Sequence, residues 1–152
     1  MTDWPPFCGA KIALIHAGHV LTHLRDDIPT IQFPGQWDLP GGGREGDETP
    51  LACALRETQE EYGLTLDPAT VTWHRIYPPR APRRRPAHFF AAAVTADQIA
   101  AIRFGDEGQG WQAMPIPTFL THPRAIPHLA DNLRDCLTDP ASPFFLAEIS
   151  RG

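Results

Sequence analysis

The sequence predicts a single α+β domain over residues 1–152, and three observations support this prediction. Short runs of β-branched and aromatic residues, such as Val71–Tyr77, recur along the chain and indicate strands. Two segments, 50–62 and 127–137, show helical periodicity together with helix-start signals. The length of 152 residues is sufficient for one domain with a substantial core.

The N-terminal part begins with two predicted strands, Lys11–His16 and Val20–Arg25, joined by a tight turn at Ala17-Gly18. After a loop, a short strand is expected at Trp37–Leu39. The glycines 41–43 that follow are interpreted as a turn, because glycine adopts conformations that other residues avoid.

The first helix is predicted over Pro50–Tyr62. Thr49 is a typical N-cap, Pro50 suits the first helical position, and Gly63 is a typical residue at which a helix ends. At about 100° per residue, one stripe of this helix is apolar and is expected to face the core. The residues of this stripe are Leu51, Ala54, Leu55, Thr58 and Tyr62.

A second face of the same helix carries the carboxylates Glu57, Glu60 and Glu61. Glu57 and Glu61 are like charges four residues apart and repel each other, and Arg56 can offset only part of this repulsion. A hard divalent cation would remove the conflict, and oxygen ligands suit Mg²⁺ or Mn²⁺. This face therefore indicates a metal site, with a solvated acidic helix surface as the alternative.

The remainder of the chain alternates between predicted strands and helical segments. His88–Thr95 is an apolar run and is expected to be a buried strand. A capping-box sequence then predicts a short helical turn over Ala96–Ala101. Trp111–Met114 is a further candidate strand, Pro127–Leu137 a second helix, and the tail Pro143–Ile149 is expected to pack on the body of the domain.

Residues 42–64, GGREGDETPLACALRETQEEYGL, fit the pattern G-x5-E-x7-R-E-U-x-E-E-x-G-U, where U is usually a bulky apolar residue. This is the signature of the Nudix hydrolases, which the chain resembles. Seven fixed positions match by accident about once in 10⁹ placements. Thr58 departs from the usual Leu, Ile or Val but keeps a β-branched shape. The matching residues are Gly42, Glu48, Arg56, Glu57, Glu60, Glu61, Gly63 and Leu64.

The resemblance implies the α+β Nudix fold, a mixed β-sheet sandwiched between helices in an α/β/α arrangement. It also implies Mg²⁺-dependent hydrolysis of the pyrophosphate linkage of a nucleoside diphosphate attached to another group, with Mn²⁺ as a possible substitute. The first expectation is a (d)NTP or modified (d)NTP, cleaved to the monophosphate and pyrophosphate. ADP-ribose, a dinucleoside polyphosphate or an RNA 5′ end are alternative substrates, and a non-catalytic binding module is a further alternative.

Metal ligands are also implied by the resemblance. In the family, the backbone carbonyl of the residue just before the first glycine of the signature binds metal. The first glycine here is Gly42, so the matching residue is Gly41. Gly42 and Glu48 would support the metal or its loop without being direct ligands. The implied metal ligands are Gly41, Glu57, Glu60, Glu61 and Glu107.

Glu107 belongs to a second segment, 104–111, which resembles the E-G-Q…W segment of MutT-type nucleoside triphosphate pyrophosphohydrolases. There the Glu completes the metal site or assists the general base; Asp106 takes this role if the register differs by one residue. The family does not use one base throughout, so Glu57 or Glu107 is expected to act on the water. Glu60 would be a ligand or an orienting group, and Arg56 would orient the carboxylates through charge-assisted hydrogen bonds.

Basic residues gather in residues 79–86, PRAPRRRP, between two predicted strands. Guanidinium groups match phosphate oxygens, so Arg83 and Arg84 are candidate phosphate contacts, together with Arg25 at the end of the second strand. The same loop would suit an RNA 5′ end. A solvated, proline-stiffened loop is the alternative.

Base specificity is less well defined by the sequence. MutT-type enzymes carry an Asn before the second helix that reads a purine edge, and residues 121–127 contain none. This argues against a preference for oxidised guanine. His122 and His128, which flank the start of that helix, are expected on the surface.

Composition limits the remaining possibilities. The net charge of −5 argues against generic binding to a nucleic-acid backbone. No apolar run reaches the 18 residues or so of a membrane span, and the N-terminus lacks the pattern of a signal peptide. Three cysteines without ligand spacing indicate reduced thiols and a cytoplasmic protein. The expected partner is a nucleotide substrate, and the sequence indicates no oligomeric state.

Overall fold

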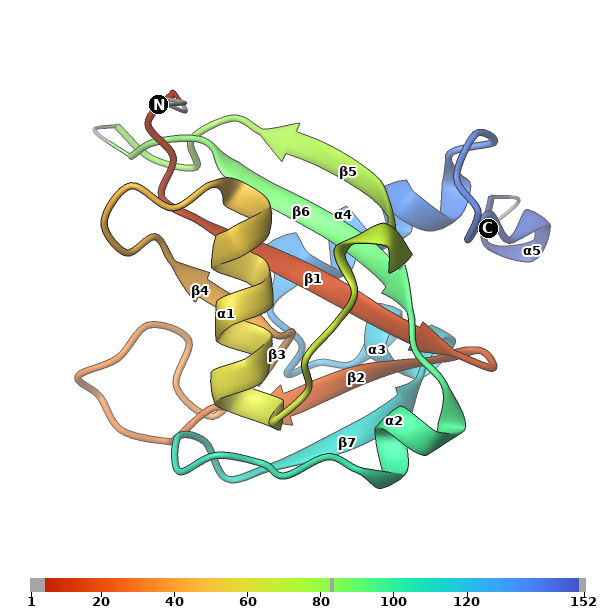
Figure 1. The fold of residues 1–152 in the computed structure, drawn as a ribbon, viewed down its shortest axis with the longest axis horizontal. Coiled ribbons are helices and arrows are strands. Elements are labelled where there is room, and N and C mark those ends of the chain that lie inside the picture. The colour runs from red at the N-terminus through yellow and green to blue at the C-terminus, as the bar shows by residue number, and fades with distance from the viewer. Residues whose placement is uncertain (1–4, 83, 151–152) are drawn as a thin grey trace.

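The computed structural model describes residues 5–82 and 84–150 (Figure 1). The strands are β1 (Gly9–His16), β2 (His19–Leu24), β3 (Trp37–Asp38), β4 (Gly41–Gly43), β5 (Val71–Tyr77), β6 (Ala87–Ala93) and β7 (Gly110–Pro115). The helices are α1 (Pro50–Tyr62), the 3₁₀ turn η1 (Pro68–Thr70), α2 (Ala96–Ala100), α3 (Ile116–Thr121), α4 (Pro127–Thr138) and α5 (Ala147–Ser150).

The described strands form one mixed sheet, as expected (Figure 1). The main strand order is β3-β2-β1-β6-β5, with β4 also pairing with β1, and β7 with β2. β1 is parallel to β6, in register from Gly9↔Ala87 to Ile15↔Ala93, whereas the other pairs are antiparallel. The predicted turn between the first two strands is confirmed, since Ala17 and Gly18 both have positive φ, as a tight hairpin turn requires.

Helices cover both faces of the sheet (Figure 1). Alternate residues of β1 divide between two cores, because successive side chains of a strand point to opposite faces. Ala10, Ile12 and Leu14 pack on the α1 side, while Ala13 and Ile15 pack on the side of α3 and α4. The predicted α+β fold with an α/β/α arrangement is confirmed.

The bounds of α1 agree with the sequence signals at both ends. Thr49 Oγ1 accepts a hydrogen bond from the Ala52 amide at 3.1 Å, and Gly63 ends the helix in the left-handed conformation with φ of 67°. Thr58 is fully buried, and its hydroxyl donates to the Ala54 carbonyl at 2.8 Å. The departure from the family pattern at this position is therefore accommodated within the helix.

Three details differ from expectation. The glycines 41–43 form strand β4 rather than a turn, and at Gly41 only glycine fits, because a Cβ there would collide with the Ala10 carbonyl. Leu51 and Leu55 are only half-buried, whereas Cys53 is fully buried, so the core stripe of α1 is rotated. Helix α3 was not anticipated; it is short, and no side chain caps its start.

The remaining predicted elements lie close to their expected bounds. β5 has the predicted limits, and the capping box of α2 is present. Leu146 and Ile149 of the tail pack against the core on the α4 side. In the described part of the chain, Cys8, Cys53 and Cys136 are free thiols, and no helix is long and apolar enough to cross a membrane.

Candidate active site

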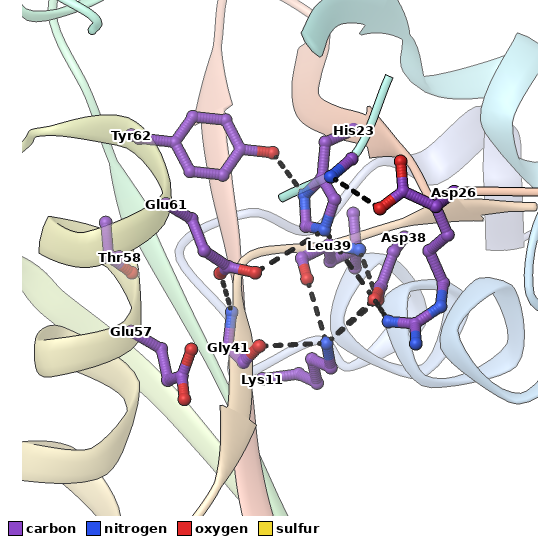
Figure 2. A network of polar contacts seen from close by, with 12 residues as sticks. Lys11, His23, Asp26, Asp38, Leu39, Gly41, Glu57, Thr58, Glu61 and Tyr62 are labelled. Carbon is purple, nitrogen blue, oxygen red and sulfur yellow. Dashed lines mark hydrogen bonds and ion pairs between the residues drawn. The ribbon is translucent and has the colours of Figure 1, made fainter. Parts of the chain in front are cut away.

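Two carboxylates of α1 lie against strand β4 (Figure 2). Glu61 Oε1 accepts a hydrogen bond from the Gly41 amide at 2.9 Å. The Glu57 carboxylate lies on the backbone of Gly42, where an added Cβ would be 2.6 Å from its Oε1. Both side chains are mostly buried, with 18% and 16% of Glu57 and Glu61 exposed. The glycine strand thus creates the space that the two carboxylates occupy.

Burial makes both carboxylates difficult to ionise. It raises the pKa of Glu61 to about 8, although Lys11 and the Gly41 amide oppose this shift. Burial also raises the pKa of Glu57, against the opposing effect of Arg56. A cation close to these carboxylates would stabilise their charged forms.

Arg56 connects the helix carboxylates to the loop before the helix. Its Nε and Nη2 donate to the two oxygens of Glu48 at 3.0 and 2.9 Å, and its Nη1 donates to Glu57 at 3.1 Å and Glu60 at 3.0 Å. Its Nη2 also donates to the Gly43 carbonyl at 2.9 Å. The hydrogen bond from Arg56 is the main reason that the pKa of Glu48 is lowered. A single guanidinium therefore fixes the position of α1 relative to β4.

Glu60 and Glu107 lie apart from the Glu57–Glu61 pair. Glu60 is half-exposed and turned toward Arg56. Glu107 is exposed, and no hydrogen bond or ion pair joins its side chain to another described residue. Its loop nevertheless docks on the end of α1, where the Gly105 amide donates to the Glu61 carbonyl at 2.9 Å. Within the described residues, no group of three His, Cys, Asp or Glu side chains is in position to hold a metal ion.

The oxygen atoms at β4 are suited to bind a magnesium ion whose remaining ligands come from substrate phosphates and water. The Gly41 carbonyl accepts from Lys11 Nζ at 3.0 Å and keeps a second lone pair. Mg²⁺ commonly binds one or two carboxylates together with substrate phosphates and waters. Glu57, Glu61 and the Gly41 carbonyl could therefore hold this ion, and the close approach of Glu57 to Gly42 is consistent with such a site.

A buried acid, Asp38, lies beside Glu57 and Glu61, and the sequence did not identify it as a candidate site residue. Asp38 is 1% exposed and forms ion pairs with Lys11 at 2.9 Å and Arg25 at 3.0 Å. Burial by itself would raise the pKa of Asp38, but Lys11, His23 and Arg25 outweigh it, so this pKa is lowered.

His23 of β2 lies between this acid and α1, and it is also buried (Figure 2). Its Nδ1 is 2.7 Å from the Tyr62 hydroxyl, and its Nε2 is 3.5 Å from Glu61 and 3.7 Å from Asp38. Burial lowers the pKa of His23 to about 4, so the imidazole is neutral near pH 7. The sequence reading assigned no role to this residue.

A hollow of 420 Å³ lies beside β4, on the sheet face that packs against α4. This volume is within the usual range for small-molecule sites. Its floor is apolar and includes Phe89, Ile126 and Leu129. Arg25 and Arg84, two of the candidate phosphate contacts, line it, whereas Arg83 lies outside the described residues.

The rim of this cavity carries three exposed arginines of the loop 78–86, Arg80, Arg84 and Arg85, which we call the arginine rim. None of them forms an ion pair with an acidic residue in the described ranges. The guanidinium of Arg80 lies over the ring of Phe33, 5.6 Å from its centroid. The cavity is therefore positively charged in a protein whose net charge is −5.

Two residues of α4 complete the cavity wall. His128, expected on the surface, is instead half-buried; burial, assisted by Arg80, lowers its pKa to about 4. Asn132 lies one turn further along the helix and also lines the cavity. Asn132 lies within the helix rather than before it, and its i, i+4 spacing from His128 is the sequence signal that places both residues on one face.

Comparison with known proteins agrees with this architecture. Residues 12–135 match the NUDIX domain. An RNA pyrophosphohydrolase of Acidiphilium cryptum is 48% identical over 50 residues, covering 32% of this chain and 29% of the relative. The m7GpppN-mRNA hydrolase NUDT17 of Danio rerio is 36% identical over 77 residues, covering 47% and 26%. The chain thus spans less than a third of the length of either relative.

Solved structures show the same fold. The MutT protein of Methanosarcina mazei superimposes with a TM-score of 0.65 at 22% identity, covering 83% of this chain and 89% of that one. At this identity the likeness shows the fold alone. It confirms the Nudix fold that residues 42–64 predicted.

Proposed function

The chain belongs to the NUDIX domain family, and from this premise we propose that it is a Mg²⁺-dependent pyrophosphohydrolase of nucleotides. The first candidate substrate is a (d)NTP or modified (d)NTP, cleaved to a monophosphate and pyrophosphate. The observation that supports this most strongly is the pair of mostly buried carboxylates, Glu57 and Glu61, beside a cavity lined with cationic side chains.

In this proposal Glu57, Glu61 and the Gly41 carbonyl would hold the metal, and Glu60 or Glu107 would supply a further oxygen ligand. Bound Mg²⁺ would neutralise the bridging phosphates and lower the pKa of a water. Arg56 keeps the carboxylates of α1 in place through its bonds to Glu57 and to the loop. Glu57 or Glu107 takes the proton of the attacking water as a P–O bond of the anhydride breaks.

The nucleoside would occupy the cavity on the other side of β4. Phe33, whose ring also contacts Arg80 and His128, lines one side, and Phe89 and Leu129 form an apolar floor. The side-chain amide of Asn132 makes no hydrogen bond to another described residue, so it can donate to and accept from a base edge. Arg25 already bonds Asp38 and the Gln32 carbonyl, and it would contact phosphate with its remaining donors.

The test is product analysis by chromatography of a nucleotide panel with Mg²⁺ or with EDTA. The panel contains canonical and oxidised (d)NTPs, ADP-ribose, sugar nucleotides and dinucleoside polyphosphates. Turnover of one class that is lost with EDTA and in Glu57→Gln would establish the activity and identify the substrate. No turnover with either Mg²⁺ or Mn²⁺ would contradict it and favour an RNA 5′ end or a non-catalytic binding module.

The arginine rim favours a second candidate, a triphosphorylated RNA 5′ end. Arg84 and Arg85 could hold phosphates beyond the first nucleotide, since their guanidinium groups have no acidic partner among the described residues. Two relatives named above act on RNA. If this candidate is correct, replacing Arg84 and Arg85 with Ala abolishes RNA turnover and spares free nucleotides; equal losses on both would contradict it.

A further inference from the structure

His23 and Tyr62 form a buried contact that the proposed chemistry does not use (Figure 2). The Tyr62 hydroxyl is 2.7 Å from His23 Nδ1, and both side chains are almost fully inaccessible to solvent. Tyr62 occupies an unspecified position of the family pattern, and His23 lies on β2, outside it. A hydrogen-bonded pair in this position directs the opposite ring nitrogen of His23 toward Glu61.

The hydrogen bond determines which nitrogen of His23 carries the proton. In the described part of the chain, the Tyr62 hydroxyl has no acceptor other than His23 Nδ1, and a buried hydroxyl needs one. Nδ1 therefore accepts, and the proton resides on Nε2. The opposite tautomer would leave the Tyr62 hydroxyl without an acceptor and would place the Nε2 lone pair toward the ionised Asp38 carboxylate at 3.7 Å, which is repulsive.

The two oxygens of Glu61 then have different partners. Oε1 accepts from the Gly41 amide at 2.9 Å, and Oε2 faces the Nε2–H of His23 at 3.5 Å. The second distance is longer than a hydrogen bond, so the contact is electrostatic and constrains the direction of the carboxylate. Glu57 has a different support, the guanidinium of Arg56.

We propose that His23 is a positioning residue that holds the Glu61 carboxylate toward the metal, with its own proton placed by Tyr62. This inference rests on the proposed function, in which Glu61 is a metal ligand. Partners of ligating side chains typically change metal affinity about 10- to 100-fold when removed. His23 would contribute to metal affinity in this way, without touching the substrate.

The test compares two substitutions of His23. One preserves the hydrogen-bond donor at Nε2, and the other preserves the hydrogen-bond acceptor at Nδ1. His23→Gln can place an amide N–H near the position of Nε2 and keeps the donor to Glu61. His23→Asn keeps an acceptor near the position of Nδ1 for Tyr62 and loses that donor. The readout is Mn²⁺ affinity, from the electron paramagnetic resonance signal of the free ion, measured on the full chain without substrate. Near-ultraviolet circular dichroism and thermal unfolding report whether each variant is folded.

We expect Mn²⁺ affinity to fall about tenfold or more in His23→Asn, and to stay within about threefold of native in His23→Gln. Tyr62→Phe removes only the hydroxyl, so it serves if His23→Asn does not fold. Its Mn²⁺ affinity is expected to fall several-fold, because the hydroxyl no longer directs the proton of His23 to Nε2. Equal affinities in His23→Asn, Tyr62→Phe and native protein would overturn the positioning role. Equal losses in His23→Asn and His23→Gln would also overturn it.

Failure of this inference can be distinguished from failure of the proposed function. If the native protein binds no Mn²⁺, the metal site itself is wrong, and the positioning role is overturned with it. If the native protein binds Mn²⁺ and the two His23 variants bind alike, only the role of His23 is overturned.

Discussion

The two ends of the cavity beside β4 differ in whether their cationic side chains are paired with an acidic residue. At one end, Lys11 and Arg25 both bond the buried Asp38. At the other end, the arginine rim is exposed and has no acidic partner among the described residues. Both groups line the same 420 Å³ hollow.

This difference separates charges that hold the fold from charges available to a ligand. A buried carboxylate is costly unless it is paired, so Asp38 requires its two cations. Exposed arginines cost little without a partner, and their donors are free to meet phosphate oxygens. Substitutions at the Asp38 end should therefore affect stability, and those at the rim should affect substrate binding.

The largest effect is expected at Asp38. Asp38→Ala removes the shared partner of Lys11 and Arg25, and we expect a loss of about 3 kcal/mol in the free energy of unfolding, as when one partner of a buried pair is removed. Urea denaturation measures this. The control is Glu45→Ala, whose side chain is 69% exposed and whose ion pair with Arg56 at 3.6 Å should be worth under about 1 kcal/mol. Similar losses in both variants would contradict the comparison.

A large effect on activity is expected at Gly42. In Gly42→Ala, the new Cβ would lie 2.6 Å from Glu57 Oε1, the movable end of a flexible side chain. Glu57 should move and the fold should remain, with turnover falling about 10²-fold, as for a misplaced catalytic group. Gly41→Ala is the contrast: its φ of 131° and the neighbouring Ala10 carbonyl predict misfolding. Steady-state kinetics of folded Gly42→Ala with normal turnover would refute this placement of Glu57.

A smaller effect is expected at the rim. If a free (d)NTP is the substrate, replacing both Arg84 and Arg85 with Ala should raise its KM about tenfold, the equivalent of one hydrogen bond to a charged group, and leave kcat and stability nearly unchanged. The difference from native protein should shrink at high salt, because exposed charges are screened. Arg103→Ala is a matched control, an exposed arginine outside the cavity. A fall in kcat with unchanged KM would argue against phosphate binding at the rim.

The smallest effect concerns pH. Burial, assisted by Arg80, lowers the pKa of His128 to about 4, below its value of 6.5 in an unfolded chain. Neutral His128 therefore contributes its full share of stability above pH 6.5, and this share is lost as pH falls from 6.5 to about 4. Part of the fall in melting temperature over that window should be absent from His128→Gln. An identical pH profile in this variant would contradict the lowered pKa.

The sequence predicted best what depends on local signals. Thr49 and Pro50 predicted the start of α1, and Gly63 predicted its end. The structure confirms both bounds. They could be predicted because capping residues act within a single turn of the helix. The mixed sheet and the α/β/α layers followed from the family resemblance. The proximity of Glu57 and Glu61 followed from helical periodicity alone.

What the sequence could not predict depends on contacts between distant segments. Asp38 meets Lys11 across 27 residues, and Arg80 reaches Phe33 from another loop. Such pairs are determined by strand register and loop packing, which a periodicity does not encode. Asn132, by contrast, depends on a local signal, its position four residues after His128 on one face of α4. The prediction considered only the residues before this helix.

The most direct test of the proposed function is the turnover of Glu57→Gln and Glu61→Gln on the preferred nucleotide. Each variant retains the size of the native side chain, so circular dichroism and melting temperature should remain close to native. We expect kcat to fall at least about 10²-fold in each, in the range for loss of a general base. Near-native turnover by both folded variants would show that the carboxylates of α1 do not carry the reaction.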